Sequence, residues 1–454
     1  NSGASSGGWV SWWLRRMTTV IEEEPYAAAV VTQHLKTVCS NCFQSSEDRR
    51  YQRCSRCRTI FYCTTECQKR DWDIHKDECT CLVSVSPRIP TSMARLLARL
   101  MIRGARGEAS RVKAFNGRTF DDLMDHMEQI QGDPERLEFF TCLAHVLQEF
   151  LSPVPDLLLP PVQLMKYFGR IVVNCFSITG DDQITLGEGV YLGLSALDHS
   201  CVPDAFVRFR GKRAILRSPQ TGIKYSDKLT IPYTALDTLG DDRRAALKRQ
   251  YYFDCRCAAC RDPERDGFAR SLRCFVCPSV CLVFPDSSVL TCISCATVQD
   301  VDVAEVMMAN QEIEWHLEKE KAEDDLSQSL STSVSLYSKH SSLLSNLNLP
   351  LASLAYRIVN VALSLEKRDV ALAHAWKYID AYRRYLPLGH PLLTSCLLAA
   401  ASAASFEDPP SVRVHGLLEE ARECCLLSHG PTDPLAVDVD RQLTLYRNRM
   451  QNSM

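Results

Sequence analysis

Apolar residues recur every three or four positions over two long regions of the chain, a spacing typical of helices that bury one face. The first region is residues 87–167, which includes MARLLARLMIRGA and ends in a proline-rich loop at residues 153–161. The second is residues 351–450, where alanines and leucines alternate with charged faces. Residues 303–323 are predicted to be a charged helix. The serine-rich residues 327–342 hold few apolar positions and are predicted to be a link.

Strand patterns occupy other parts of the chain. Residues 18–32 form two short apolar runs around a turn at Glu24-Pro25, which predicts two strands. The stretch 187–260 contains further short apolar runs, interrupted by the helical pattern DDRRAALKRQY. Helices and strands are therefore predicted to occupy separate regions, which is an α+β fold.

A short motif near the C-terminus occurs twice. YLPLGHP at residues 385–391 recurs loosely as SHGPTDP at residues 428–434, 43 residues later. That period fits helix pairs stacked as tetratricopeptide-like repeats.

Composition narrows the class of protein without identifying it. The 454 residues suffice for two to four domains, and the apolar share of 46% is ordinary for soluble globular protein. A net charge of -3 does not point to nucleic acid. No run of eighteen apolar residues occurs, so we expect no membrane span.

The first sixteen residues, NSGASSGGWVSWWLRR, do not read as a signal peptide, because their apolar core precedes the arginines. The chain starts at Asn1, and Met17 is the first methionine. We therefore expect residues 1–16 to be incomplete or non-native.

The spacing of the 22 cysteines favours zinc over disulfides, because most of them lie in short clusters. The densest cluster supplies eight ligands in residues 39–79. They are Cys39, Cys42, Cys54, Cys57, Cys63, Cys67, His75 and Cys79. A segment this small cannot bury a sufficient core, so two zinc ions are predicted to hold it together.

Two further ligand sets follow in the sequence. The lone Cys201 precedes the packed trio Cys255, Cys257 and Cys260, and these four thiolates could close a tetrahedral site. Cys274, Cys277, Cys292 and Cys295 then have the spacing of a zinc ribbon, with Cys281 as a competing thiol. The prediction is four zinc ions, or three if the ribbon is empty.

These motifs resemble a known family. The first cluster resembles a MYND finger, in which the ligand pairs interleave. Asp198-His199-Ser200-Cys201-x-Pro203 is close to the N-H-S-C-x-P motif of SET lysine methyltransferases, and LTIPY at residues 229–233 resembles the strand that ends in their active-site tyrosine. A finger and helices inserted into a SET domain are the layout of the SMYD family.

The resemblance implies six segments. They are an N-terminal part of SET at 1–38, the MYND finger at 39–79, a helical insert at 80–165, the SET core at 166–250, a post-SET zinc segment with a ribbon at 251–300, and a helical tetratricopeptide-like domain at 301–454. It also implies a protein-lysine N-methyltransferase that uses S-adenosylmethionine, acts on histone or cytosolic proteins, and is a monomer of the cytoplasm and nucleus.

The resemblance assigns roles to particular residues. Tyr233 would orient the lysine amine, Tyr251 would form a wall of its channel, and Phe253 would pack on the adenine side of the cofactor. The remaining implied cofactor contacts are Ser195, Asp198, His199, Asn174 and His126, the last on a helical segment. Phe176 would border the channel together with Asn174.

Two departures from the family keep an alternative open. Asp198 replaces the family's asparagine, and an ionised aspartate only accepts hydrogen bonds. The glycine-rich cofactor turn has only Gly3, Gly7 and Gly8 as candidates, so weak activity is predicted for this chain. The alternative is an inactive zinc-binding adaptor, with the finger binding proline-containing peptides. The basic face of the finger, which includes Arg53, Arg56 and Arg58, suits an acidic partner or a weak DNA contact.

Overall fold

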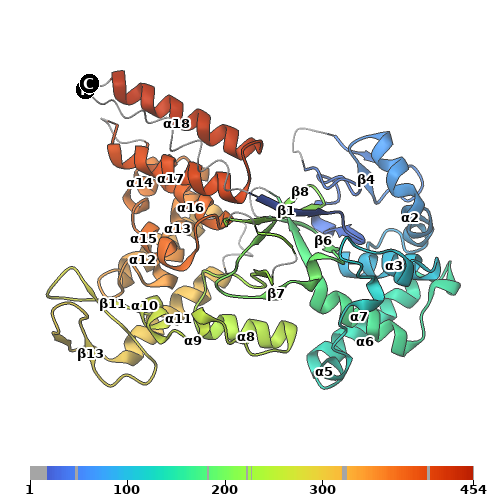
Figure 1. Ribbon diagram of the computed structural model, residues 1–454, viewed down its shortest axis with the longest axis horizontal. Helices are drawn as coiled ribbons and strands as arrows, with labels where there is room; N and C mark the ends of the chain where they lie inside the picture. Colours follow the sequence, from blue (N-terminus) through green and yellow to red (C-terminus); the bar gives the residue numbers. More distant parts are fainter. Residues whose placement is uncertain are drawn as a thin grey trace.

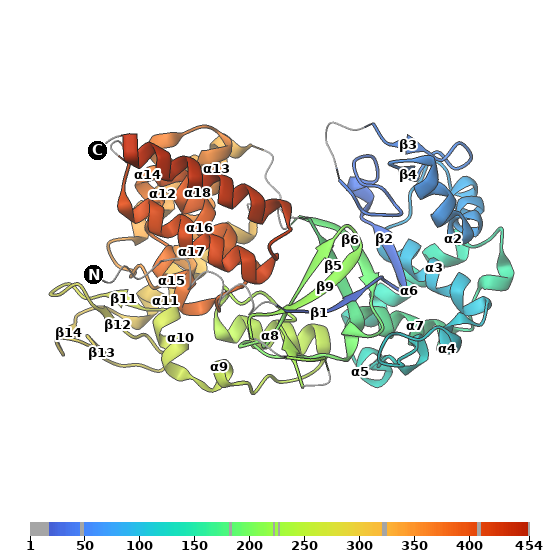
Figure 2. The ribbon, with the colours of Figure 1, turned by 45° about the horizontal axis from the view of Figure 1, so that its top comes forward.

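The computed structural model describes residues 18–45, 50–180, 184–220, 223–225, 228–319, 325–405 and 410–452. The expectations for residues 1–16 and for the turn at Gly3, Gly7 and Gly8 lie outside these ranges. Helices and strands occupy separate regions, as predicted. In Figures 1 and 2, two small sheets lie between the N-terminal finger and helices on the right and the C-terminal helices on the left.

The two predicted N-terminal strands are confirmed as β1 (Thr18–Glu23) and β2 (Ala27–Val30). Each pairs antiparallel with a strand far along the chain. β1 pairs with β9 (Arg213–Ser218), which also pairs with β8 (Phe206–Arg210). β2 pairs with β6 (Thr185–Val190), which also pairs with β5 (Cys175–Thr179). A short parallel pair, β7 (Asp198–His199) and β10 (Thr230–Ile231), includes two of the candidate site residues, Asp198 and His199.

The finger contains a small antiparallel pair and one long helix. The pair is β3 (Gln52–Arg53) and β4 (Phe61–Tyr62), and a 3-10 helix, η1 (Thr32–His34), precedes the finger. Helix α2 (Thr65–Ser84) begins after Thr64, whose side chain accepts a hydrogen bond from the Cys67 N–H.

The helical pattern predicted for residues 87–167 is confirmed, whereas the bounds of an insert at 80–165 stay a prediction. The elements of this region are α3 (Ser92–Ala105), α4 (Glu108–Arg111), η2 (Phe120–Asp122), α5 (Met127–Gln131), α6 (Pro134–Phe150), η3 (Pro155–Leu157) and α7 (Pro161–Asn174). Helix α7 runs seven residues past the predicted end at Tyr167, because Phe168, Ile171 and Val172 continue its buried face.

After η4 (Leu194–Ala196), the chain forms α8 (Gly240–Tyr251), α9 (Ala258–Arg261) and α10 (Pro263–Ala269). Two hairpins then make the ribbon: β11 (Leu272–Arg273) pairs with β12 (Val280–Cys281), and β13 (Leu290–Thr291) pairs with β14 (Val298–Gln299). The C-terminal helices are α11 (Val303–Lys319), α12 (Leu326–His340), α13 (Leu349–Ser364), α14 (Arg368–His374), α15 (Ile379–Tyr385), α16 (Pro391–Ala404), α17 (Val412–Ser428) and α18 (Pro434–Asn452).

The prediction of a link at residues 327–342 was wrong, because helix α12 covers most of it. The Asp325 carboxylate caps the start of this helix by accepting from the Ser327 and Gln328 N–H groups. The buried face includes the small side chains of Ser329 and Ser333 as well as apolar residues. Serines therefore take positions on the packed face that apolar residues usually occupy. The apolar periodicity that predicts a helix is weak here for this reason.

The repeated motif near the C-terminus marks two equivalent helix connections. Both copies lie between helices, and the second helix of each pair begins at a proline, Pro391 in α16 and Pro434 in α18. Gly389 and Gly430 each have a positive φ, at 85° and 94°. The assignment to tetratricopeptide-like repeats stays a prediction. Within the described residues, no helix is both long enough and apolar enough to cross a membrane.

The buried apolar residues form two large clusters. One joins the finger, helices α3 to α7 and the sheets, and the other joins residues 251–300 to the C-terminal helices. Tyr233 packs against both clusters. The candidate site therefore lies where the two cores meet.

Buried ionic contacts fasten the C-terminal helices to the β8–β9 hairpin. The Arg208 guanidinium binds the Asp433 carboxylate and donates to the His429 carbonyl at 3.3 Å. The side chains of Arg208 and Asp433 are 8% and 2% exposed. On the next strand, Arg217 Nε donates to the Leu427 carbonyl at 3.1 Å, at the end of α17. An ion pair and hydrogen bonds to carbonyls near the end of α17 thus hold the two cores together.

We predict that Asp433→Asn destabilises this junction. The asparagine side chain can still accept a hydrogen bond from the Leu435 N–H at the start of α18, but the buried Arg208 guanidinium loses its ion pair with residue 433. Removing one partner of a buried pair costs about 3 kcal/mol in the free energy of unfolding. Chemical denaturation monitors this loss. The control Asp438→Asn, at an exposed pair with Arg441, should cost under about 1 kcal/mol, and equal losses would contradict the prediction.

Candidate functional site: zinc clusters and an aromatic pocket

Four groups of side chains have the geometry of zinc sites, and each contains the residues predicted from the spacing. The groups are Cys39, Cys42, Cys63 and Cys67; Cys54, Cys57, His75 and Cys79; Cys201, Cys255, Cys257 and Cys260; and Cys274, Cys277, Cys292 and Cys295. Within each group, the ligand atoms all lie within 4.8 Å of one another. The interleaving implied for the finger is present, and Cys281 is not in the ribbon group.

The sulfur separations fit tetrahedral zinc. Zinc-sulfur bonds of about 2.3 Å in tetrahedral geometry place the sulfurs about 3.8 Å apart. The Sγ–Sγ distances are 3.6 Å for Cys42–Cys63, 3.7 Å for Cys201–Cys260 and 3.5 Å for Cys277–Cys292. A disulfide would need about 2 Å, so these thiols are arranged for metal.

Analysis of the purified protein should give four zinc ions per chain. Each group is complete, and the ligands of the third group all belong to, or pack against, one buried cluster. Elemental analysis with protein quantification tests this, and Cys295→Ser should lower the count by one while leaving the other three sites filled. Two or fewer ions in the unsubstituted chain would contradict the ligand assignment at Cys201 and at the ribbon.

A buried polar network links the second finger site to the helical insert. His75 Nδ1 lies 3.0 Å from Glu78 Oε2, which leaves Nε2 on the cysteine side, 3.6 Å from Cys57 Sγ. Arg99 of α3 donates to Glu78 at 2.6 Å and to Asp71 at 3.0 Å. Burial alone would raise the pKa of Glu78, but Arg99 and His75 overcome it and hold the pKa well below its usual range. The carboxylate thus stays charged and orients the imidazole.

Glu78→Gln should weaken zinc at this site about 10- to 100-fold, because a neutral amide orients the His75 ring less well. Release of zinc to a chromophoric chelator measures the effect, and one ion per chain should leave faster than the rest. Glu66→Gln, on the exposed side of the same helix, is the control. Identical release curves for both variants would show that Glu78 does not support the metal.

The third zinc group brings distant aromatic residues together. Cys201 follows β7, whereas the trio follows α8 and the aromatic segment 251–253. The Tyr233 and Tyr251 ring centroids lie 4.8 Å apart, and the His199 ring lies 5.3 Å from Tyr233 and 5.9 Å from Phe253. Bringing these four rings together requires the tail to fold back onto the loop, which the metal group achieves.

A hydrogen bond from the backbone fixes which nitrogen of the His199 imidazole carries the proton. The Tyr233 N–H donates to His199 Nδ1 at 3.0 Å, so Nδ1 carries no proton, and Nε2 lies 3.3 Å from Cys201 Sγ. Burial lowers the pKa of His199 to about 4. The imidazole is therefore neutral at physiological pH, with its proton on Nε2.

A pocket of about 420 Å³ opens beside this aromatic cluster. Four of the predicted site residues line it: Asn174, Ser195, Tyr233 and Tyr251, together with Phe176. None of the described residues that line it is an Asp, Glu, Lys or Arg. The pocket is thus an aromatic, uncharged cavity at the junction of the two cores.

The hydroxyl of Tyr233 donates to the Leu197 carbonyl. Burial raises the pKa of this tyrosine, and the nearby Asp198 carboxylate adds to the rise. The phenol therefore keeps its proton, which is committed to a backbone oxygen, and its own oxygen can accept a further hydrogen bond.

The remaining predicted residues lie outside the pocket lining. Asp198 is exposed, and His199 and Phe253 lie behind Tyr233. His126 is not within a helix as expected. It is the residue before α5, with a left-handed φ of 45°, and its ring lies 5.7 Å from that of Tyr252. Asn174 connects to this region, because its Nδ2 donates to the Met124 carbonyl at 2.9 Å.

Sequence reasoning missed contributions from both ends of the chain. His390 and Pro391 of the C-terminal repeat motif line the pocket, and the His390 ring contacts Phe206 at a centroid distance of 5.1 Å. Glu23 accepts the Gly193 and Leu194 N–H groups at 2.7 and 2.8 Å, beside Ser195. The motif at 385–391 was visible in the sequence, but no local signal linked either residue to the pocket.

Together, these features define a zinc-stabilised protein with an uncharged aromatic pocket. A MYND finger family model matches residues 39–79, the bounds predicted from the ligand spacing. Three related proteins extend the similarity. Histone-lysine N-methyltransferase SMYD3 of Homo sapiens is 30% identical over 260 residues, which is 56% of this chain and 58% of that protein. The chain thus spans less than two thirds of that relative.

Two relatives align over more of the chain. Mouse histone-lysine N-methyltransferase SMYD3 is 26% identical over 84% of this chain and 81% of its own length. Arabidopsis thaliana histone-lysine N-methyltransferase ASHR1 is 23% identical over 93% of this chain and 89% of its own length. Over most of its length the chain is thus similar to SMYD proteins that are named as histone-lysine N-methyltransferases.

Proposed function

We propose that this protein transfers a methyl group from S-adenosylmethionine to a lysine side chain of a protein substrate. The observation that carries the proposal is the uncharged pocket lined by Tyr233 and Tyr251. S-adenosylmethionine supplies the electrophilic methyl group when bound. The residues of the chain must then favour the uncharged form of the lysine amine, orient this amine and surround it.

The pocket suits a neutral amine. A free lysine titrates near 10.4, so most of it is charged in water at neutral pH. An uncharged cavity disfavours the ammonium form by desolvation, whereas the tyrosine faces tolerate the positive charge of the methylated product. Tyr233 presents a phenol oxygen whose proton is held by the Leu197 carbonyl, so this oxygen can accept from the amine and orient it.

The residues around the pocket fit the donor. The exposed Asp198 carboxylate, beside the aromatic cluster, suits the ammonium group of S-adenosylmethionine, and Phe253 offers a ring face for the adenine. We assign further cofactor contacts to Ser195, His199, Asn174 and His126. The zinc of the third group would support them by holding the tail against the loop.

The substrates in this proposal are lysines of histone or cytosolic proteins, reached by a monomer in the cytoplasm and nucleus. The finger would bind proline-containing peptides, with weak DNA contact through its basic face. An inactive adaptor is the alternative, motivated by the replacement of the family's asparagine by Asp198. Calorimetric titration with S-adenosylmethionine separates the two functions, because the adaptor would show no saturable heat.

Tyr233→Phe should lower kcat for methyl transfer about 100-fold, because the amine loses the oxygen that aims it. Incorporation of labelled methyl groups into histone and cytosolic protein mixtures measures this. Tyr385→Phe is the control, since it removes a buried hydroxyl that donates to the Leu347 carbonyl at 3.1 Å, far along the chain. Equal activity of Tyr233→Phe and the unsubstituted chain would remove Tyr233 from the mechanism.

Substitutions in different zinc groups should have unequal effects on the affinity for the cofactor. Cys255→Ser should weaken S-adenosylmethionine binding, because it frees the segment that carries Tyr251 and Phe253. Cys39→Ser should disrupt the finger and leave cofactor affinity unchanged. Calorimetry on both variants tests the division, and equal weakening in the two would refute it.

A further inference from the structure

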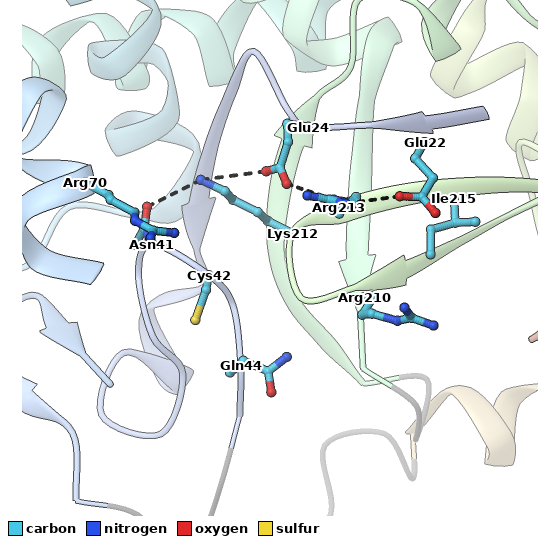
Figure 3. A pocket seen from close by; sticks show the side chains of 10 residues that line it. All are labelled: Glu22, Glu24, Asn41, Cys42, Gln44, Arg70, Arg210, Lys212, Arg213 and Ile215. Atoms are coloured by element: carbon cyan, nitrogen blue, oxygen red, sulfur yellow. Dashed lines mark hydrogen bonds and ion pairs between the residues drawn. The ribbon is translucent and has the colours of Figure 1, made fainter. Parts of the chain in front are cut away.

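A second cleft, of about 500 Å³, lies between the finger and the tip of the β8–β9 hairpin (Figure 3). It shares no lining residue with the aromatic pocket. The finger contributes Asn41, Cys42, Gln44 and Arg70; the sheet side contributes Glu22, Glu24, Arg210, Lys212, Arg213 and Ile215. The proposed methyl transfer makes no use of these side chains.

The cleft is held in shape by backbone contacts across its floor. The Lys212 N–H donates to the Cys42 carbonyl at 3.2 Å, and the Tyr191 hydroxyl donates to the Lys212 carbonyl at 2.5 Å. Gly211 has a φ of 58°, and a Cβ there would lie 2.1 Å from the Cys42 carbonyl oxygen. Only glycine permits this approach, so the hairpin tip is docked on the finger and the walls are preformed.

The charges of the cleft are unevenly distributed. Arg213 is neutralised, since it pairs with Glu22 at 3.1 Å and with Glu24 at 3.0 Å. The other three cations have weaker partners. Lys212 Nζ lies 4.0 Å from Glu24 Oε2. Arg210 Nη2 lies 3.8 Å from Asp433 Oδ2, but the Asp433 carboxylate is already bound to Arg208. Arg70 has a side chain that is 69% exposed and pairs with Glu66 on its own helix.

The cleft therefore carries a surplus of two positive charges, four cations against two carboxylates. Figure 3 shows the Glu22, Glu24 and Arg213 group on one side and Arg70 beside Asn41 on the other. An anionic ligand would face Arg70, Lys212 and Arg210, at which a carboxylate gains charge-assisted hydrogen bonds.

Two features favour a peptide over a nucleic acid. The exposed side-chain amide of Gln44 can pair with the donors and acceptors of a peptide backbone, whereas Asn41 Oδ1 already accepts from Lys212 Nζ at 3.5 Å. Glu22 and Glu24, which are held by Arg213, can accept hydrogen bonds from peptide N–H groups, which a nucleic-acid backbone lacks. A volume of about 500 Å³ also suits a few amino-acid residues.

We propose that this cleft binds an acidic segment of a partner protein, through Arg70 on the finger and Lys212 and Arg210 on the hairpin. The segment would lie across the finger-hairpin junction, outside the methyl-transfer pocket. This binding does not depend on the cofactor and can be measured without it.

The test uses the full chain and a fluorescein-labelled peptide of repeating Glu-Gly-Ser units, followed by fluorescence anisotropy. The unsubstituted chain should bind this peptide, with an affinity that falls as salt is raised. Arg70→Gln/Arg210→Gln removes one exposed cation from each wall and should weaken binding at least about tenfold. Arg111→Gln/Arg249→Gln removes two exposed cations that lie outside both the cleft and the finger, and it should leave binding unchanged.

Three outcomes would overturn the proposal. Equal losses in the two double variants would mean that overall basic charge, not the cleft, attracts the peptide. Equal binding of a peptide with Gln in place of every Glu would exclude charge recognition. Tighter binding of a DNA duplex of the same net charge, lost in Arg70→Gln/Arg210→Gln, would assign the cleft to nucleic acid. Zinc content confirms that each variant has kept its finger.

Discussion

The thiolate group formed by Cys201, Cys255, Cys257 and Cys260 is the constraint on which the pocket depends. Its ligands come from a loop and from a tail more than fifty residues later, and their atoms lie within 4.8 Å of one another. Tyr251 and Phe253 are only a few residues from Cys255, so closing this group also places them beside Tyr233 and His199. A few coordinate bonds thus replace the large apolar interface that would otherwise be needed to order a short tail.

The pocket also depends on the docking of the two cores. Asn174 and Ser195 come from one core, whereas His390 and Pro391 come from the C-terminal helices. Contacts of Arg208 and Arg217 with Asp433 and the end of α17 hold these parts together. Because such contacts are ionic and directional, they fix an orientation that apolar packing alone would leave less defined.

The metal groups and the main helices could be predicted from sequence, since ligand spacing and helical periodicity are local signals. The contributions of Glu23 and His390 could not, because they depend on contacts between residues far apart in the chain. Helix α12 was missed for a different reason. Its packed face uses Ser329 and Ser333, and small polar residues on a buried face do not register in an apolar pattern. His126 was placed in a helix, yet it adopts a left-handed conformation just before one.

The long-range pairing of the first strands sets an order of events during synthesis. The finger has all its ligands within residues 39–79, so it can close around its metals as soon as it leaves the ribosome. β1 and β2 emerge earlier, but their partners are Arg213–Ser218 and Thr185–Val190. At about 5 to 20 residues per second, these strands stay without partners for on the order of ten seconds after the finger is complete. The first strands of the sheets to be synthesised are thus among the last to be paired, and until then their backbone N–H and C=O groups stay open to pairing with another chain.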